Sequence, residues 1–166
     1  ESPLVEDNML IVTPGGKAGT LLALDKYTGE KLWQSNEVNE GAHYSSPVAA
    51  DILGTRTIVQ FARNSVFGVT ADGGKFLWKY SGANNGTANC ATPIVDDNHV
   101  FAASAYGTGG GLAKISKEGD NQSSAASSGW GGKWLMNRPS STAPCLTRTI
   151  WCRNSAPPRG SSSCAR

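Results

Sequence analysis

The sequence lacks the features that mark a helical or membrane-spanning protein. It has no apolar run of 18 residues and no charged-then-apolar leader, so it predicts neither a membrane span nor a signal peptide. No segment repeats apolar residues with a 3.6-residue period over the length of a helix. The net charge of +2 gives no reason to expect a polyanionic partner such as nucleic acid. Because the chain opens at Glu1 rather than at methionine, we expect it to be a fragment of a longer protein.

Motifs for metal binding or catalysis are also missing. The four cysteines form no C-x-x-C pair and no adjacent Cys-Cys pair, which argues against a zinc site. Cys90 is expected to be a small buried apolar residue. His43 and His99 belong to no recognisable nucleophile motif, and Gly107–Gly111 matches neither phosphate-binding pattern, so we expect structural roles for all of them. The cysteines are Cys90, Cys145, Cys152 and Cys164.

A tryptophan-terminated unit is what the sequence does contain, and it occurs twice. The first copy reads ALDKYTGEKLW and ends at Trp33, and the second reads GVTADGGKFLW and ends at Trp78. The two tryptophans are 45 residues apart, and each follows a glycine, Gly29 or Gly74, by four positions. A period in the mid-forties with strand-like content is typical of β-propeller blades.

Short strand-like runs and turns fill each period. A proline followed by apolar residues begins each unit at Pro3, Pro47 and Pro93, with spacings of 44 and 46 residues. Runs of β-branched and aromatic residues bounded by Gly, Asn and Asp predict strands and hairpins. The sequence therefore predicts an all-β fold: a partial β-propeller of four-stranded antiparallel blades with an irregular C-terminal tail. The expected blades cover residues 2–43, 44–89 and an incomplete 90–118.

The residues at fixed positions in this unit resemble a known repeat. The pattern Ala-x-Asp-x-x-x-Gly-x-x-x-Trp resembles the tryptophan-docking repeat of the pyrroloquinoline-quinone-type (PQQ-like) β-propellers. That superfamily includes quinoprotein alcohol dehydrogenases and an outer-membrane assembly lipoprotein whose propeller binds no quinone. The resemblance predicts a structural docking motif formed by Ala23, Asp25, Gly29, Trp33, Gly74 and Trp78.

The later copies depart from the pattern. The second has Gly68 and Thr70 where alanine and aspartate are expected, and the third, counted from Pro93, has Ser116 at the aspartate position. We expect Trp33 to be buried against the neighbouring blade. Trp78 is expected to be less buried, because the third blade would be incomplete.

Composition changes beyond Glu118. Residues 121–166 are rich in Ser, Arg, Pro, Cys and Trp, and they contain no acidic residue. We expect residues 119–166 to be an irregular low-complexity tail outside the propeller. A natural tail and an out-of-frame translation are both open explanations for it.

The functional expectation follows from the repeat and its resemblance. We favour a non-catalytic scaffold or protein-interaction module with no catalytic, cofactor or metal residues in this chain. Its partners would be the remaining blades of the parent propeller and an unidentified protein, with no nucleic acid and no membrane span. Family analogy implies export to the bacterial periplasm. The alternative is a fragment of a PQQ-dependent alcohol dehydrogenase lacking its catalytic blades, and only this alternative implies PQQ and calcium.

Overall fold

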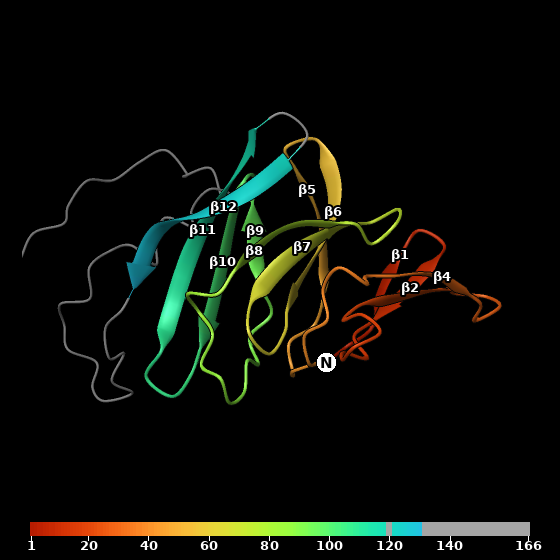
Figure 1. Cartoon of the computed structure of the whole chain (residues 1–166), viewed down its shortest axis with the longest axis horizontal. Coiled ribbons are helices and arrows are strands. Elements are labelled where there is room, and N and C mark those ends of the chain that lie inside the picture. Colours follow the sequence, from red (N-terminus) through yellow and green to blue (C-terminus); the bar gives the residue numbers. More distant parts are fainter. Residues whose placement is uncertain (119–120, 131–166) are drawn as a thin grey trace, which may run out of the picture. The chain divides into compact units, whose positions relative to one another are not determined.

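The computed structural model describes residues 1–118 and 121–130, and this part of the chain is built of β-strands without a helix (Figure 1). The strands form three four-stranded antiparallel sheets, each ordered as the strands follow in the sequence. Blade 1 consists of β1 (Leu4–Glu6), β2 (Met9–Val12), β3 (Leu22–Asp25) and β4 (Lys31–Gln34). Blade 2 consists of β5 (Val48–Ile52), β6 (Thr55–Phe61), β7 (Val66–Thr70) and β8 (Phe76–Tyr80). Blade 3 consists of β9 (Ile94–Asp96), β10 (His99–Ser104), β11 (Gly109–Glu118) and β12 (Asn121–Trp130). The predicted all-β partial propeller is confirmed.

The same irregularity recurs in every blade. Pairing between the third and fourth strands shifts at one position in each sheet, just after Ala23, Gly68 and Leu112. A bulge of this kind adds one residue to one strand and increases the local twist. Its recurrence identifies Ala23, Gly68 and Leu112 as equivalent positions of the repeat.

The middle blade is buried on both faces, which explains its continuous apolar runs. In β6 the last five residues are all buried, and in β7 the first four are. Ile58 and Phe67 belong to a core shared with blade 1, whereas Val59 and Val66 belong to a core shared with blade 3. A strand covered on both sides needs apolar residues at consecutive positions rather than at alternate ones.

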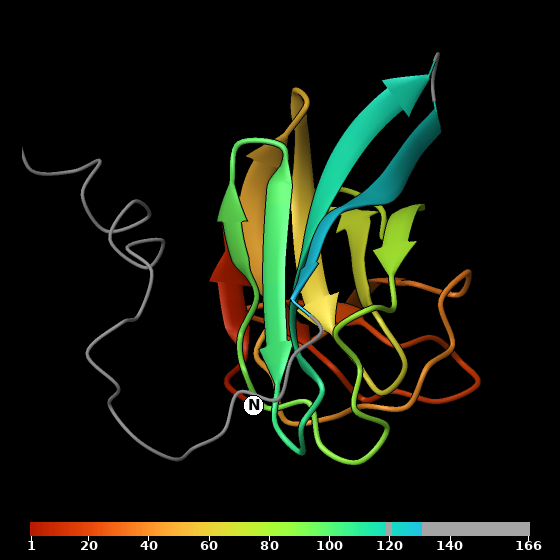
Figure 2. The same ribbon diagram turned by 90° about the vertical axis from the view of Figure 1, so that its left-hand side faces the viewer.

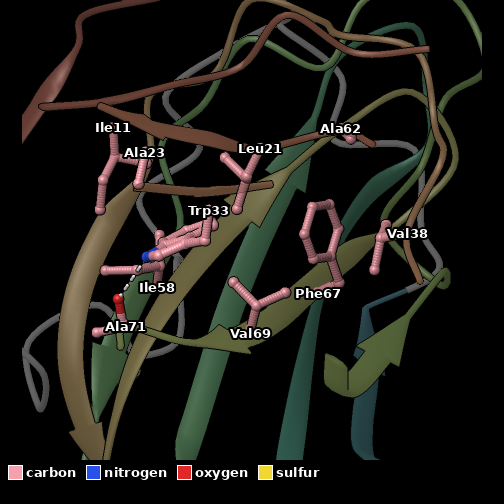
Figure 3. Close-up of a cluster of buried hydrophobic side chains, with 10 residues drawn as sticks. All are labelled: Ile11, Leu21, Ala23, Trp33, Val38, Ile58, Ala62, Phe67, Val69 and Ala71. Atoms are coloured by element: carbon pink, nitrogen blue, oxygen red, sulfur yellow. Dashed lines mark hydrogen bonds between the residues drawn. The ribbon is translucent and has the colours of Figure 1, made fainter. Parts of the chain in front are cut away.

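Two hydrophobic cores thus connect the three sheets in sequence. The core between blades 1 and 2 is drawn in Figure 3 and contains Ile11, Leu21, Ala23, Trp33, Val38, Ile58, Ala62, Phe67, Val69 and Ala71. The core between blades 2 and 3 contains Ile52, Val59, Phe61, Val66, Trp78, Ala83, Val100, Ala102, Ala113 and Ile115. Each sheet supplies one apolar face to its neighbour, as blades that cannot bury both faces alone must do.

The expected end of the propeller at residue 118 is wrong. β11 and β12 are ten residues each and form the long hairpin drawn from teal to blue in Figure 2. The fourth strand needs few apolar side chains, because its stabilisation comes from backbone pairing with β11 and from polar contacts with blade 2. Ser124 Oγ donates to the Lys79 carbonyl, and Gln122 Nε2 lies 3.4 Å from Thr55 Oγ1. The third blade is therefore complete, and the predicted irregular tail of residues 119–166 is wrong for residues 121–130, which form β12. The rest of that predicted tail lies outside the described residues.

Candidate blade-docking site

Trp33 lies on β4 and reaches from blade 1 into blade 2. Its side chain is 8% exposed, and its indole Nε1 donates a 3.0 Å hydrogen bond to the carbonyl of Ala71 (Figure 3). Phe67 and Val69 of β7 belong to the same buried cluster. The indole therefore combines apolar burial with one directed hydrogen bond across the boundary between the blades.

Gly74 shapes the surface under that indole. A Cβ built at Gly74 would lie 2.4 Å from Cε3 of Trp33, closer than real Cβ contacts. Its backbone also has a φ of +68°, where side chains are strained. Glycine is thus required at this position for two reasons: the turn has a positive φ, and the tryptophan of the preceding blade leaves no room for a Cβ atom.

Gly29 occupies the equivalent position in blade 1, but no side chain packs against it. Its φ is +75°, and a Cβ there would meet no atom within 4 Å. The two turns share their backbone hydrogen bonds: Gly29 N donates to Asp25 O at 2.9 Å, and Gly74 N donates to Thr70 O at 3.0 Å. Blade 1 therefore presents an open copy of the surface that holds Trp33 on blade 2.

The acceptor carbonyl has an equivalent in blade 1 as well. Ala71 N donates to Arg56 O, and Lys26 N donates to Asn8 O, both at 2.9 Å. These matching bonds identify Lys26 as the residue of blade 1 that is equivalent to Ala71 in blade 2. The Lys26 carbonyl is thus the counterpart, by position in the repeat, of the carbonyl that accepts from Trp33.

Asp25 holds the first of these turns together. Its Oδ1 accepts 2.8 Å hydrogen bonds from the backbone N–H groups of Tyr27 and Thr28. The bond from Thr28, and then that from Tyr27, lower the pKa of the Asp25 carboxyl. The positive charge of nearby Lys26 lowers it slightly further. In blade 2, Thr70 stands at this position, and its Oγ1 accepts from Lys75 N at 3.3 Å. The aspartate is thus a turn-forming residue in this structure.

The small residue at the start of the motif faces the tryptophan of its own blade. Ala23 pairs with Trp33, and Gly68 pairs with Trp78. A Cβ at Gly68 would lie 2.5 Å from Cε2 of Trp78, so that indole lies directly across the glycine backbone. The glycine that departs from the motif in the second copy is therefore explained by close packing.

Trp78 is more buried than Trp33, contrary to expectation. It is 1% exposed because β10 and β11 of the third blade supply Val100 and Ile115 to the core around it. Its Nε1, unlike that of Trp33, is buried without a hydrogen-bond partner. The equivalent acceptor, the carbonyl of Ile115, instead accepts from Asn98 Nδ2 at 3.3 Å.

The third copy of the motif is shifted by two residues from the position expected. Ile115 N donates to Asn98 O, and this bond corresponds to the bonds that the backbone N–H groups of Lys26 and Ala71 make in the other two blades. Lys114, rather than Ser116, therefore stands at the aspartate position. The shift arises because β9 has three residues where β5 has five. In the strand register, Ser128 pairs with Leu112, as Trp33 pairs with Ala23 and Trp78 with Gly68.

The other candidates from the sequence are scattered. Cys90 is exposed rather than buried, since it lies in the linker that follows blade 2 and not within a sheet. His99 begins β10, and His43 lies in the linker between blades 1 and 2. Among residues 1–118 and 121–130, no group of three or more His, Cys, Asp or Glu residues could hold a metal ion. The described part of the chain also contains no helix long and apolar enough to cross a membrane.

Three successive four-stranded antiparallel sheets, joined face to face and each shaped by the same bulge, define a β-propeller repeat protein. A family model of PQQ-type repeats, described as outer membrane protein assembly factor BamB, matches residues 1–139. The chain belongs to this family. The match also includes β12, in agreement with its place in the third blade. A search of curated proteins finds no match.

Proposed function

We propose that this chain is a non-catalytic propeller module that acts as a scaffold by binding further blades and a protein partner. The open surface at Gly29 is the observation that carries the proposal, because its counterpart at Gly74 holds Trp33. In this proposal Trp33, Gly74, Ala23, Asp25 and the equivalent Gly29 are docking residues, and Trp78 serves the next blade boundary. The family name, which refers to outer membrane protein assembly, supports a role with protein partners in the periplasm.

A tandem duplication tests the docking surface. A copy of residues 1–45 is placed before Glu1 of the full chain, so that the added tryptophan precedes Trp33 by 45 residues, the natural spacing from Trp33 to Trp78. We expect the added indole to become buried over Gly29, which would blue-shift its fluorescence and slow exchange of its N–H proton. The matched control carries Gly29→Asn, since asparagine tolerates a positive φ but fills the open space. An added tryptophan that stays solvent-exposed in the duplicated chain would contradict the proposed surface.

Catalysis is tested separately. The alternative, a fragment of a PQQ-dependent alcohol dehydrogenase, requires quinone binding and a calcium site. We expect the purified chain to take up no stoichiometric PQQ in the presence of calcium and to reduce no dye with an alcohol substrate. Stoichiometric quinone uptake with calcium-dependent dye reduction would overturn the scaffold proposal and support the dehydrogenase.

A further inference from the structure

The linkers between consecutive blades are joined by polar groups, of which Glu40, Ser65 and Asn89 are buried and His43 is half-buried. We call this set, Glu40, His43, Ser65 and Asn89, the linker seam. Glu40 lies in the linker after blade 1, and its carboxylate accepts from Ser65 N at 3.0 Å and from Ser65 Oγ at 2.6 Å. Ser65 stands in the turn between β6 and β7, so this contact joins the first linker to blade 2.

Asn89 makes the corresponding connection from the linker after blade 2. Its side chain is fully buried, and its Nδ2 donates to the carbonyls of Ala62 at 2.8 Å and Arg63 at 3.1 Å. The same nitrogen lies 3.1 Å from Oδ1 of Asn84. Both linkers are thus hydrogen-bonded to the β6–β7 turn.

His43 joins the two linkers directly. Its Nδ1 accepts a 3.1 Å hydrogen bond from the backbone N–H of Asn89, and Tyr44 N donates back to the Asn89 carbonyl at 3.2 Å. An imidazole nitrogen that accepts a hydrogen bond must be unprotonated, so His43 is neutral here with its proton on Nε2. One of the two hydrogen bonds of this joint therefore depends on the protonation state of the His43 side chain.

We propose that His43 is an acid-sensitive joint between the blade 1–2 and blade 2–3 linkers. Protonation of Nδ1 would convert the acceptor into a donor that faces the Asn89 N–H, and two donors cannot bond each other. The linker pair would then separate around Asn89 and loosen the junction of the blades. Ser65 and Asn89 do not ionise, and His43 is the seam residue whose ordinary pKa lies near neutral pH.

The surroundings of His43 favour its neutral form. Burial lowers the pKa of His43 below its ordinary value of 6.5, the positive charge of Arg63 lowers it further, and the carboxylate of Glu40 partly offsets both. Tyr44 also faces the imidazole, with ring centroids 6.0 Å apart. Because the folded-state pKa lies below the unfolded value, His43 contributes its full stabilisation above the unfolded pKa. That contribution is lost as the pH falls through 6.5 toward the folded pKa.

A variant that keeps the acceptor but cannot titrate separates this proposal from general acid sensitivity. His43→Asn retains a carbonyl oxygen close to the position of Nδ1, and His99→Asn is the matched control on β10. Urea midpoints of the full chain are measured between about pH 5 and pH 8, the range in which histidine titrates. We expect the parent and His99→Asn to lose stability on acidification and His43→Asn to show a smaller loss. The same loss in His43→Asn as in the parent would overturn the proposal.

NMR titration of the parent chain gives a second, independent test. We expect the His43 ring to titrate below 6.5 and the Asn89 amide resonance to shift with the same midpoint. A His43 pKa at or above 6.5, or an Asn89 amide that does not respond, would also overturn the proposal. This measurement holds even where the asparagine variant fails to fold.

Discussion

Alanine substitution at the two equivalent turn glycines separates backbone strain from blade docking. Gly29 and Gly74 have φ values of +75° and +68°, so alanine costs about 1–2 kcal/mol at each from the left-handed backbone alone. Only at Gly74 does the new Cβ collide with Trp33, at 2.4 Å from Cε3. Forcing a methyl group into a packed site adds about 1–3 kcal/mol. We therefore expect Gly74→Ala to lose about 2–5 kcal/mol and Gly29→Ala about 1–2 kcal/mol.

Urea unfolding of the two variants and the parent provides the assay. The midpoint and slope of each curve give the free energy of unfolding, and an unchanged slope shows that the same surface is exposed in all three. Gly29→Ala is the internal control because nothing lies within 4 Å of its added methyl group. Equal losses for the two variants would refute the role of Gly74 as the surface under Trp33.

Two further predictions concern the same motif. Trp33→Phe keeps most of the apolar ring but removes the donor to Ala71 O, so we expect a loss of about 0.5–1.5 kcal/mol from the hydrogen bond. Trp33→Ala also removes the buried ring, and we expect a larger loss of about 3–5 kcal/mol. A melting temperature for Trp33→Ala within a degree or two of the parent would count against burial of the indole at the blade boundary. Asp25→Ala removes the acceptor for Thr28 N and Tyr27 N, and those bonds lower the folded pKa of Asp25 below 3.8. The stability difference between parent and variant should therefore be present above that pH and disappear as the pH falls through the folded pKa. Urea unfolding as a function of pH measures this difference, and a difference that persists in strong acid would show that the carboxylate is not responsible.

The positions of the repeat that could be predicted from the sequence are those at which a single physical requirement decides the residue type. The 45-residue spacing of Trp33 and Trp78 reflects one large buried side chain per blade, and the preceding glycines reflect turns with positive φ. Apolar runs were sufficient to predict strands because burial on one or both faces decides them. The all-β fold and its four-stranded blades therefore followed from local patterns.

The missed features depend on pairing between distant segments. β12 has a serine-rich sequence without an apolar pattern, and its strand structure comes from backbone hydrogen bonding to β11. Trp78 is buried by residues of the next blade, Val100 of β10 and Ile115 of β11, and that contact between sheets has no local signal in the sequence. The linker seam joins Glu40, His43 and Asn89 through loops, where no periodic signal marks a contact.

A double-mutant cycle of Trp33 and Gly74 tests most directly the claim that an indole from one blade is seated on the glycine turn of the next. Free energies of unfolding are measured for the parent, Trp33→Ala, Gly74→Ala and the double variant. Once the indole is absent, the methyl group at residue 74 has nothing to displace. We therefore predict that Gly74→Ala in the Trp33→Ala background costs only the backbone strain seen in Gly29→Ala. Additive losses, with Gly74→Ala costing the same in both backgrounds, would contradict the account.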